Sequence, residues 1–332
     1  MNESNATQKS TVVQERVAEP LATRFASAQL LGDLSTITDY VRFCFSRLNE
    51  AEVYCGHGND NSWDEALHLV LHSLHLDAQI NPQMMNAVLT IEERDLLWNR
   101  IQKRIDHRIP NAYLLGEAWF MGIPFFVDER VLIPRSPIAE LIENRFSPWV
   151  DMERVESVLD LCCGSGCIGI ASAMMFEQVA VDLVDISKDA LQVAGSNIAR
   201  HHMESRVKAV ESDLFSAVTG KYDLILSNPP YVDKQDLESM PAEYAKEPVL
   251  GLAAGADGLD IARRILKGSR CHLNDGGLLV VEVGNSWVAL EEAYPTVPFT
   301  WIEFEHGGGG VFVMTSDELD HFQAVFDQGC LD

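Results

Sequence analysis

The spacing of apolar side chains divides the chain into a helical part and an alternating part. Over residues 28–54, apolar positions recur every three or four residues, which is the period of an amphipathic helix. Two further helices are predicted, over residues 62–76 and 90–109. Residues 28–109 therefore predict a small helical domain. Residues 1–27 carry no such pattern, and we expect them to form a flexible tail.

Capping residues support two of the predicted helix starts. Ser62 is followed three residues later by Glu65, and Thr90 is followed at the same spacing by Glu93. A hydroxyl residue and a glutamate at this spacing form a capping box, in which each side chain accepts a hydrogen bond from a backbone N–H of the first turn. We therefore expect Ser62 and Thr90 to be the N-caps of the second and third helices.

A short β segment follows the helical domain. Residues 117–133 contain alternating positions around a Met-Gly turn at 121–122, which predicts a β-hairpin within a connector that spans residues 110–134. A helix over residues 136–146 is expected next, with Pro137 at its first position.

From about residue 155, short apolar runs alternate with helical segments. The predicted strands are 157–161, 180–184, 206–210, 222–227 and 277–284, and the predicted helices between them are 167–176, 188–201 and 258–272. A terminal β-hairpin is predicted from residues 299–305 and 311–315. This alternation is typical of a doubly wound α/β fold. We assign it residues 135–332.

The charge balance narrows the choice of partner. Among 332 residues, 25 Lys and Arg stand against 50 Asp and Glu, which gives a formal net charge of −25. Such a chain is a poor candidate for holding DNA or RNA, because phosphate contacts need cationic side chains. The charge favours a cationic partner or a small ligand, although an acidic surface also serves solubility alone. We expect no direct sequence-specific contact with nucleic acid.

The apolar runs and the cysteines of the sequence indicate a cytoplasmic location. It contains no run of about 18 apolar residues that would cross a membrane, and its first residues lack the apolar core of a secretory signal. Seven irregularly spaced cysteines are typical of reduced thiols in the cytoplasm. No metal is expected, because the cysteines at 162–167 lack a second ligand pair and the histidines at 68–75 lack the glutamate of a zinc-protease helix.

The first strand of the α/β domain ends in a glycine-rich turn. Residues 160–169 read DLCCGSGCIG. Gly164 and Gly166 lack a Cβ atom and let a ligand approach the backbone. The spacing from Gly164 to Gly169 also fits a dinucleotide fingerprint, and a purely structural turn would have the same composition. We expect Asp160 to orient this turn and not to touch a ligand.

Acidic residues follow the next two strands. Asp185 ends the second strand, where a carboxylate can accept both hydroxyl protons of a ribose diol. Asp213 and Leu214 follow the third strand, where Asp213 would accept from an adenine amino group and Leu214 would pack on the ring. Either acid alone could instead be a helix N-cap. Because three strand ends meet in one crevice, a nucleoside site is favoured.

The fourth strand ends in Asn228-Pro229-Pro230-Tyr231. Two prolines fix the backbone and remove two N–H donors, so that the carbonyl groups there stay free to accept hydrogen bonds. A proline pair can also simply stop a strand, but its position beside the predicted crevice favours a function. NAD-dependent enzymes have no use for this motif, whereas the acid at the end of the second strand suits enzymes that use NAD and enzymes that use S-adenosylmethionine (SAM) alike.

The segments DLCCGSGCIG, VDIS, SDLF and SNPPY, in this order, resemble the class I SAM-dependent methyltransferases that modify planar nitrogens. Over residues 28–325 the chain resembles the protein-(glutamine-N5) methyltransferases of the HemK/PrmC group. Arg135-Ser136-Pro137, EPVLGLAAGADGLD and EVGNS are most similar to the PrmB type, which acts on large-subunit ribosomal protein 3. Cys162 departs from the glycine that many methyltransferases have there. The resemblance implies a Rossmann-like, seven-stranded, mostly parallel sheet with a terminal antiparallel hairpin, preceded by a small helical domain.

The resemblance also implies a reaction, the in-line transfer of a methyl group from SAM to the side-chain nitrogen of a glutamine. Asn228 Oδ1 and the Pro229 carbonyl would accept the two amide N–H groups, Pro230 would hold the turn, and Tyr231 would pack on the amide. The implied cofactor-binding residues are Cys162, Cys163, Gly164, Ser165, Gly166, Asp185, Asp213, Leu214 and Asn228. The implied partner is a basic ribosomal protein, recognised through the helical domain and the connector.

Three other interpretations remain open. A release-factor glutamine methyltransferase would use the same chemistry. A nucleic-acid adenine methyltransferase shares the (Asn/Asp)-Pro-Pro-(Tyr/Phe) motif, but it needs a cationic surface and a pocket for a flipped base. A non-catalytic ribosome assembly factor would keep the fold without the activity, and the intact motif at 228–231 disfavours it.

Overall fold

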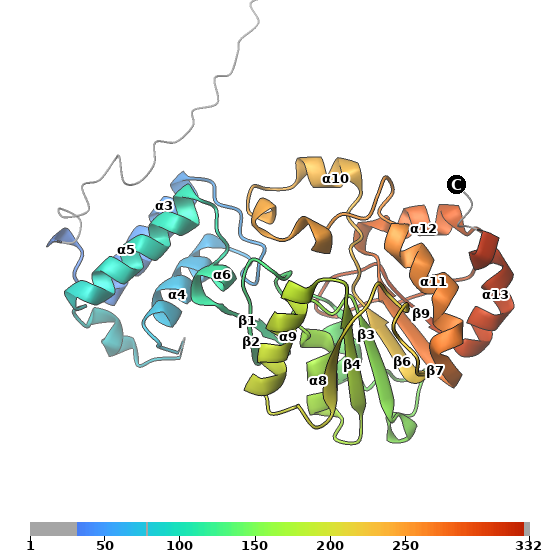
Figure 1. Cartoon of the computed structure of the whole chain (residues 1–332). Helices are drawn as coiled ribbons and strands as arrows, with labels where there is room; N and C mark the ends of the chain where they lie inside the picture. The colour runs from blue at the N-terminus through green and yellow to red at the C-terminus, as the bar shows by residue number, and fades with distance from the viewer. Residues whose placement is uncertain (1–31, 78, 329–332) are drawn as a thin grey trace, which may run out of the picture.

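The computed structural model describes residues 32–77 and 79–328. The N-terminal part consists of α3 (Ile37–Glu50), α4 (Ser62–Ser73), η1 (Pro82–Asn86), α5 (Ile91–Asp106) and α6 (Asn111–Leu115). The three longer helices bury their apolar faces in a shared core, which confirms the predicted helical domain. Figure 1 shows it at one end of the molecule, beside the sheet. The predicted tail at 1–27 and the start of the first predicted helix lie outside the described residues.

One of the two predicted caps is confirmed and the other is wrong. Thr90 caps α5 in a capping box with Glu93. The N-cap of α4 is Asn61 and not Ser62, because the Asn61 side chain accepts from the first backbone N–H groups of the helix. Glu65 does not complete a box, since its carboxylate turns inward and binds Arg104 at 2.7 Å. The ion pair with buried Arg104 thus uses the Glu65 carboxylate that the local pattern had assigned to the capping box.

The connector forms the predicted hairpin. Strands β1 (Glu117–Phe120) and β2 (Ile123–Phe126) pair antiparallel across the Met-Gly turn, whose two residues both have positive φ. The chain then reaches α7 (Ile138–Glu143). This helix is shorter than predicted, and Pro137 is its N-cap instead of its first residue.

A seven-stranded sheet forms the centre of the second domain. Its strands are β3 (Ser157–Leu161), β4 (Ala180–Asp185), β5 (Val207–Glu211), β6 (Tyr222–Ser227), β7 (Leu273–Glu282), β8 (Thr300–Trp301) and β9 (Val311–Thr315). The spatial order is β5-β4-β3-β6-β7-β9-β8. The first five strands are parallel, and β9 runs antiparallel to β7 and to β8. The predicted mostly parallel sheet with a terminal antiparallel hairpin is confirmed.

Helices cover both faces of the sheet (Figure 1). One face packs against α7, α8 (Cys167–Met175) and α9 (Lys188–Arg200). The other face packs against α11 (Asp260–His272), α12 (Trp287–Ala293) and α13 (Ser316–Gln328). The segment after β6 contains α10 (Lys234–Ser239), η3 (Tyr244–Lys246) and η4 (Val249–Gly251), and η2 (Met152–Arg154) and η5 (Gly284–Ser286) are short turns. The elements α10, α12 and α13 were not predicted.

The strand order places a crevice at the carboxyl ends of the central strands. Successive connections run outward from β3 toward β5, and then in the other direction from β6 toward β7. The chain order therefore reverses between β3 and β6. In open α/β sheets, ligands bind at such a switch point, outside the carboxyl ends of the strands. None of the helices in the described ranges is long and apolar enough to cross a membrane.

Candidate active site

A cavity of about 250 Å³ lies at the carboxyl ends of β3, β4 and β6. It brings together most of the predicted site residues, namely Cys162, Cys163, Gly164, Ser165, Asp185, Asp213, Leu214, Asn228 and Pro230. Gly166, Pro229 and Tyr231 do not line it. The end of the connector and the two residues after it contribute residues 130–136 to its wall, and the segment after the proline motif contributes Pro248, Leu250, Gly251 and Ala253. The cavity is therefore enclosed by several stretches of chain that are distant in sequence.

The glycine-rich turn presents backbone to this cavity. Cys162, Gly164 and Gly166 all have positive φ, and no atom lies within 4 Å of the position that a Cβ on Gly164 would take. The backbone around Gly164 is thus open to a ligand. Burial raises the pKa of the Cys162 and Cys163 thiols well above the usual value, and that of Cys167 to about 12, so these side chains stay protonated at neutral pH.

Asp160 is fully buried beneath the turn. Its Oδ2 accepts a hydrogen bond from the Gly169 backbone N–H at 2.9 Å, in the first turn of α8. Burial raises the pKa of this carboxyl to about 7. Asp160 does not line the cavity, as expected, and it fixes the glycine turn against the start of the helix.

The Asp185 carboxylate connects two backbone segments at the cavity wall. Its Oδ2 accepts from the Gly164 N–H at 2.9 Å, and its Oδ1 accepts from the Ser187 N–H at 2.8 Å. Burial raises the pKa of this carboxyl, while the backbone hydrogen bonds act in the opposite direction. Each carboxylate oxygen can accept a second hydrogen bond, which is what a ribose diol requires.

Asp213 has a partner that the sequence did not reveal. Its Oδ1 pairs with Arg264 Nη2 of α11 at 2.8 Å, and both residues line the cavity. The ion pair leaves lone pairs on both carboxylate oxygens that can accept from a ligand. Leu214 is nearly buried next to it and has a positive φ of 49°. No motif in the predicted helix at 258–272 singled out Arg264, because the pairing joins α11 to the turn after β5, which meet only in the folded protein.

Asn228 places an unpaired hydrogen-bond acceptor in the cavity. Its side-chain oxygen is buried and accepts no hydrogen bond from the described part of the chain. An unpaired buried acceptor costs about 1–3 kcal/mol, which a ligand N–H donor would recover. The next two residues are prolines and bring no N–H group that could occupy this oxygen. The site is therefore prepared to accept a hydrogen bond from a ligand.

Tyr231 lies behind the cavity wall and is held at three points. Its hydroxyl donates to Glu282 Oε1 at 3.1 Å, and its carbonyl oxygen accepts from Ser286 Oγ at 2.8 Å. The ring packs so closely on Gly284 that a Cβ there would overlap it. The second Glu282 oxygen accepts from Ser136 Oγ at 2.6 Å. Burial raises the pKa of the Glu282 carboxyl to about 7.

Glu282 and Ser136 were missed as site residues. The segments EVGNS and Arg135-Ser136-Pro137 carried the family resemblance, but no local pattern showed that two residues 146 positions apart share a hydrogen bond behind Tyr231.

The residues considered for a metal do not form a metal centre here. His68 and His72 contact each other edge to face, with ring centroids 4.4 Å apart, and His68 Nδ1 lies 3.3 Å from Asn59 Nδ2. Across residues 32–77 and 79–328, no three His, Cys, Asp or Glu side chains are arranged to hold a metal ion.

The residues of the cavity fit SAM. Glycine backbone in the left-handed region is open to the cavity, the Asp185 carboxylate can accept from a ribose diol, and the Leu214 side chain is available to an adenine ring. The unpaired Asn228 oxygen lies in the same cavity. One cavity thus combines a nucleoside-binding wall with an acceptor for amide N–H groups.

Comparison with known proteins agrees with this chemistry. The family described as "Methyltransferase small domain" matches residues 146–244. The ribosomal protein uL3 glutamine methyltransferase of Francisella tularensis is 50% identical over 299 residues, which cover 90% of this chain and 95% of that protein. The enzyme of the same name from Neisseria meningitidis is 45% identical over 292 residues, which cover 88% and 96%.

Among solved structures, the hMettl16 catalytic domain in complex with the MAT2A 3′UTR hairpin 6 aligns with a TM-score of 0.47 and 16% identity. The alignment covers 72% of this chain and 87% of that one. The assignment rests on the two sequence relatives, which match almost end to end. The chain belongs to the family of ribosomal protein uL3 glutamine methyltransferases, which use SAM as methyl donor.

Proposed function

We propose that the protein transfers a methyl group from SAM to the side-chain nitrogen of a glutamine in ribosomal protein uL3. The single observation that carries the chemistry is the buried, unpaired Asn228 oxygen within a cavity that fits SAM. The acceptor comes from the names of the two relatives. An amide nitrogen is a poor nucleophile, because its lone pair is delocalised into the carbonyl group. The site must therefore orient the amide and draw electron density toward its nitrogen.

In this proposal, Asn228 Oδ1 and the Pro229 carbonyl accept the two N–H groups of the glutamine amide. Bound SAM supplies an electrophilic methyl group on a sulfonium. The two fixed acceptors aim the nitrogen at that carbon and stabilise the positive charge that develops on it. Holding two reactants in line can contribute roughly 7–11 kcal/mol of the barrier reduction. As the N–C bond formed, the C–S bond would break and the sulfur would leave as a neutral thioether, and the methylated nitrogen would release one proton to water. No strong base is required, because a positively charged amide nitrogen is acidic.

Pro230 and Tyr231 shape this acceptor site. Pro230 lines the cavity and holds the turn, whereas Tyr231 supports the wall from behind through Glu282, Gly284 and Ser286. Packing of the Tyr231 ring on the glutamine amide would need the ring to reach the cavity, which it does not line in this structure. We propose that it supports the motif and excludes water.

We propose cofactor contacts for the predicted set. The backbone of Cys162, Cys163, Gly164, Ser165 and Gly166 holds the methionine part, with Gly166 shaping the turn from outside the cavity. Asp185 binds the ribose, and Leu214 packs on the adenine. The adenine amino group donates to the Asp213 carboxylate, which also pairs with Arg264.

We assign acceptor recognition to residues 28–109 and to the connector at 110–134, and catalysis to residues 135–332. A ribosomal acceptor supports the proposal that the reaction takes place in the cytoplasm. The six cysteines in the described ranges are all free thiols, in keeping with a reducing compartment.

Mass spectrometry tests the proposal. The purified protein is incubated with SAM and either unmodified uL3 or an unmodified release factor. We expect a gain of one methyl group on one glutamine of uL3 alone. A gain on the release factor alone would keep the chemistry and overturn the acceptor, and SAM binding with no gain on either protein would favour a non-catalytic assembly role.

The Asn228→Ala variant tests the role of the acceptor oxygen. We expect kcat to fall by about a hundredfold or more, as for the loss of one aligned polar contact in a transition state. Turnover near the wild-type rate, measured by the same methylation assay, would contradict this role.

A further inference from the structure

A short segment between the proline motif and α11 joins the helical domain to the cavity. Two of its glutamates, Glu243 and Glu247, are 2% and 3% exposed. Neither belongs to the cavity lining, yet Pro248, Leu250 and Gly251, which follow directly, do. Figure 1 shows this part of the chain, around and after α10, between the helical domain and the carboxyl edge of the sheet. Buried carboxylates need partners, and the partners show what the segment is attached to.

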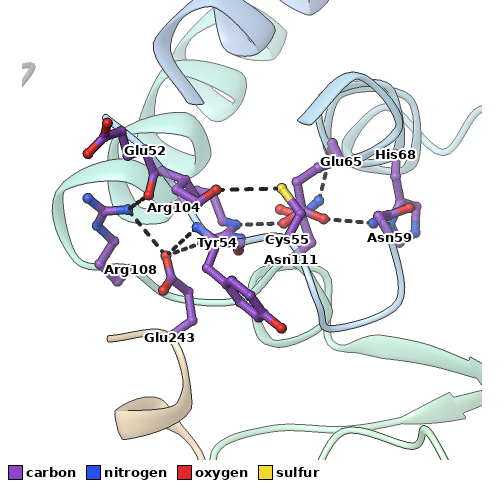
Figure 2. Close-up of polar contacts among 11 residues, drawn as sticks. Glu52, Tyr54, Cys55, Asn59, Glu65, His68, Arg104, Arg108, Asn111 and Glu243 are labelled. Atoms are coloured by element: carbon purple, nitrogen blue, oxygen red, sulfur yellow. Dashed lines mark hydrogen bonds and ion pairs between the residues drawn. The ribbon is translucent and has the colours of Figure 1, made fainter. Parts of the chain in front are cut away.

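Glu243 binds three groups of the helical domain, as Figure 2 shows. Its Oε1 accepts from the Tyr54 backbone N–H at 3.2 Å and from Arg108 Nη1 at 3.3 Å. Arg104 Nη1 lies 3.6 Å from the same oxygen. The contacts come from the loop after α3 and from the C-terminal end of α5. One carboxylate of the methyltransferase domain is thus held by two separate parts of the helical domain.

Arg104 is fully buried between two carboxylates. Its Nε donates to Glu65 Oε1 at 2.7 Å within the helical domain, while its Nη1 faces Glu243. With Arg108, the cluster holds two carboxylates and two guanidinium groups, so its charges balance. Removal of one partner leaves an uncompensated buried charge, which is strongly unfavourable. These directional ion pairs therefore restrict the position of Glu243 relative to the helical domain more tightly than apolar packing alone would.

Glu247 attaches the same segment to the connector. Its carboxylate accepts from Arg135 Nη1 at 2.6 Å and Nη2 at 2.7 Å, and from the Ile133 backbone N–H at 3.1 Å. Ile133 and Arg135 both line the cavity. Burial alone would raise the pKa of Glu247, but the contacts with Arg135 and with His57 together outweigh it and lower that pKa to about 2, so the carboxylate stays charged near neutral pH.

Tyr244 fills the space between the two ion-pair clusters. Its ring lies 4.6 Å from the His57 ring of the helical domain, and the Arg135 guanidinium carbon lies 5.4 Å from its centroid. Glu247 Oε2 also lies 3.7 Å from His57 Nε2. Five consecutive residues, 243–247, thus contact the helical domain along their length and the cavity wall at Glu247. Any shift of the helical domain relative to Glu243 would be passed to Pro248, Leu250 and Gly251.

We propose that Glu243 is a positioning residue for methyl transfer, which acts by clamping the segment 243–251 to Tyr54, Arg104 and Arg108 so that the cavity wall holds its shape. The helical domain then supports SAM binding itself, in addition to recognising the acceptor. The kinetic part of this proposal rests on the proposed function, whereas the effect on SAM affinity does not depend on which acceptor is used.

Two variants that share Arg104 provide the test. Glu243→Gln removes the charge that faces the methyltransferase domain, and Glu65→Gln removes the equally buried charge on the other side of the same arginine. Both variants are expected to lower the unfolding temperature. We expect Glu243→Gln to raise the SAM dissociation constant, measured by calorimetry, at least fivefold and to lower kcat with uL3 at least fivefold. Glu65→Gln should keep both values within twofold of wild type.

Two outcomes would overturn the clamp. In one, folded Glu243→Gln protein binds SAM and turns over within twofold of wild type. In the other, Glu65→Gln loses as much SAM affinity and turnover as Glu243→Gln, which would point to general destabilisation. If Glu243→Gln does not fold, Arg108→Lys replaces it, because Arg108 is partly exposed and lysine keeps the positive charge that faces Glu243. Arg108→Lys is then expected to weaken SAM binding at least twofold, and unchanged SAM affinity would overturn the proposal.

Discussion

At the residue scale, Asn228 and Asp185 are prepared for a ligand in opposite ways. The Asn228 oxygen is buried without a donor, so binding an amide N–H removes an existing cost. Both Asp185 oxygens already accept backbone N–H groups, which fixes the carboxylate before any ligand arrives. The first residue gains its partner only from the acceptor, whereas the second is preorganised by the glycine turn and by the start of α9.

Asp185→Ala should weaken SAM binding by roughly 1.5–3 kcal/mol, the range for a hydrogen bond to a charged group. The loss includes the Gly164 N–H contact, which shapes the turn. Calorimetric titration with SAM measures the change. Asp182→Ala is the control, because Asp182 lies on the same strand but accepts from Tyr222 outside the cavity. Equal SAM affinity in the Asp185→Ala and wild-type proteins would remove Asp185 from the site.

Glu282 gives a pH-dependent prediction. Its pKa is about 7 in the folded protein against an ordinary 4.5, so the folded state holds the proton more tightly than the unfolded chain does. The free energy of unfolding should therefore fall as pH rises from about 4.5 to 7, by up to roughly 3 kcal/mol from this group. Asp160, with its pKa also about 7, contributes with the same sign.

Glu282→Gln should make this decline shallower, and urea unfolding of both proteins at pH 5 and pH 8 measures it. As pH rises, the free energy of unfolding of the wild type should fall more than that of the variant. A difference that is constant across this range would show that Glu282 does not titrate there. Ser136→Ala checks the local structure, since it removes a hydrogen-bond donor without removing the carboxylate.

At the element scale, two glycines in neighbouring helices have opposite environments. A Cβ on Gly169 of α8 would overlap Leu183 and come within 3.0 Å of Val181, both buried on β4. A Cβ on Gly195 of α9 would meet nothing within 4 Å. Gly169 lets α8 approach the sheet closely, and this approach places the glycine turn at the cavity. Gly195 has no such role in the packing.

Gly195→Ala should raise the free energy of unfolding by up to about 1 kcal/mol, because alanine is the better helix former. Gly169→Ala should lower it by about 1–3 kcal/mol, because the added methyl group forces buried neighbours to move. Chemical denaturation of the two variants gives both values. If Gly169→Ala were as stable as wild type, the close approach of α8 to β4 would not depend on the missing Cβ.

At the scale of the whole molecule, the formal charge of −25 suits a basic acceptor. Opposite net charges raise the rate of encounter, and salt screens this attraction, with a Debye length of about 8 Å at physiological ionic strength. We expect the KM for uL3 to rise as salt increases from 50 to 300 mM, while the KM for SAM changes much less. Steady-state kinetics at several salt concentrations distinguish the two. A KM for uL3 that does not depend on salt would show that net charge plays no part in recognition.

The sequence predicted the sheet and most of the cavity, because their signals are local. Strand β6 has three successive buried apolar residues after Asp223, so it appears as a short apolar run, and the glycine turn and the proline motif each lie within a few positions. The remaining features depend on side chains that meet only after folding. Glu65 binds Arg104 instead of completing the predicted capping box, and Arg264 of α11 pairs with Asp213 in the turn after β5. No local pattern reports such pairs.

The clamp on Glu243 also bears on how the chain folds during synthesis. Arg108 precedes Glu243 by 135 residues, so at about 5–20 residues per second the helical domain waits roughly 7–30 s for its last partner to leave the ribosome. An apolar face would be exposed to aggregation during that interval. The face that awaits Glu243 instead presents guanidinium and backbone N–H groups, which water solvates well until the carboxylate arrives. Because the contacts of Glu243 are charged, we expect the two domains to fold one after the other and to associate last, without exposing an aggregation-prone apolar surface.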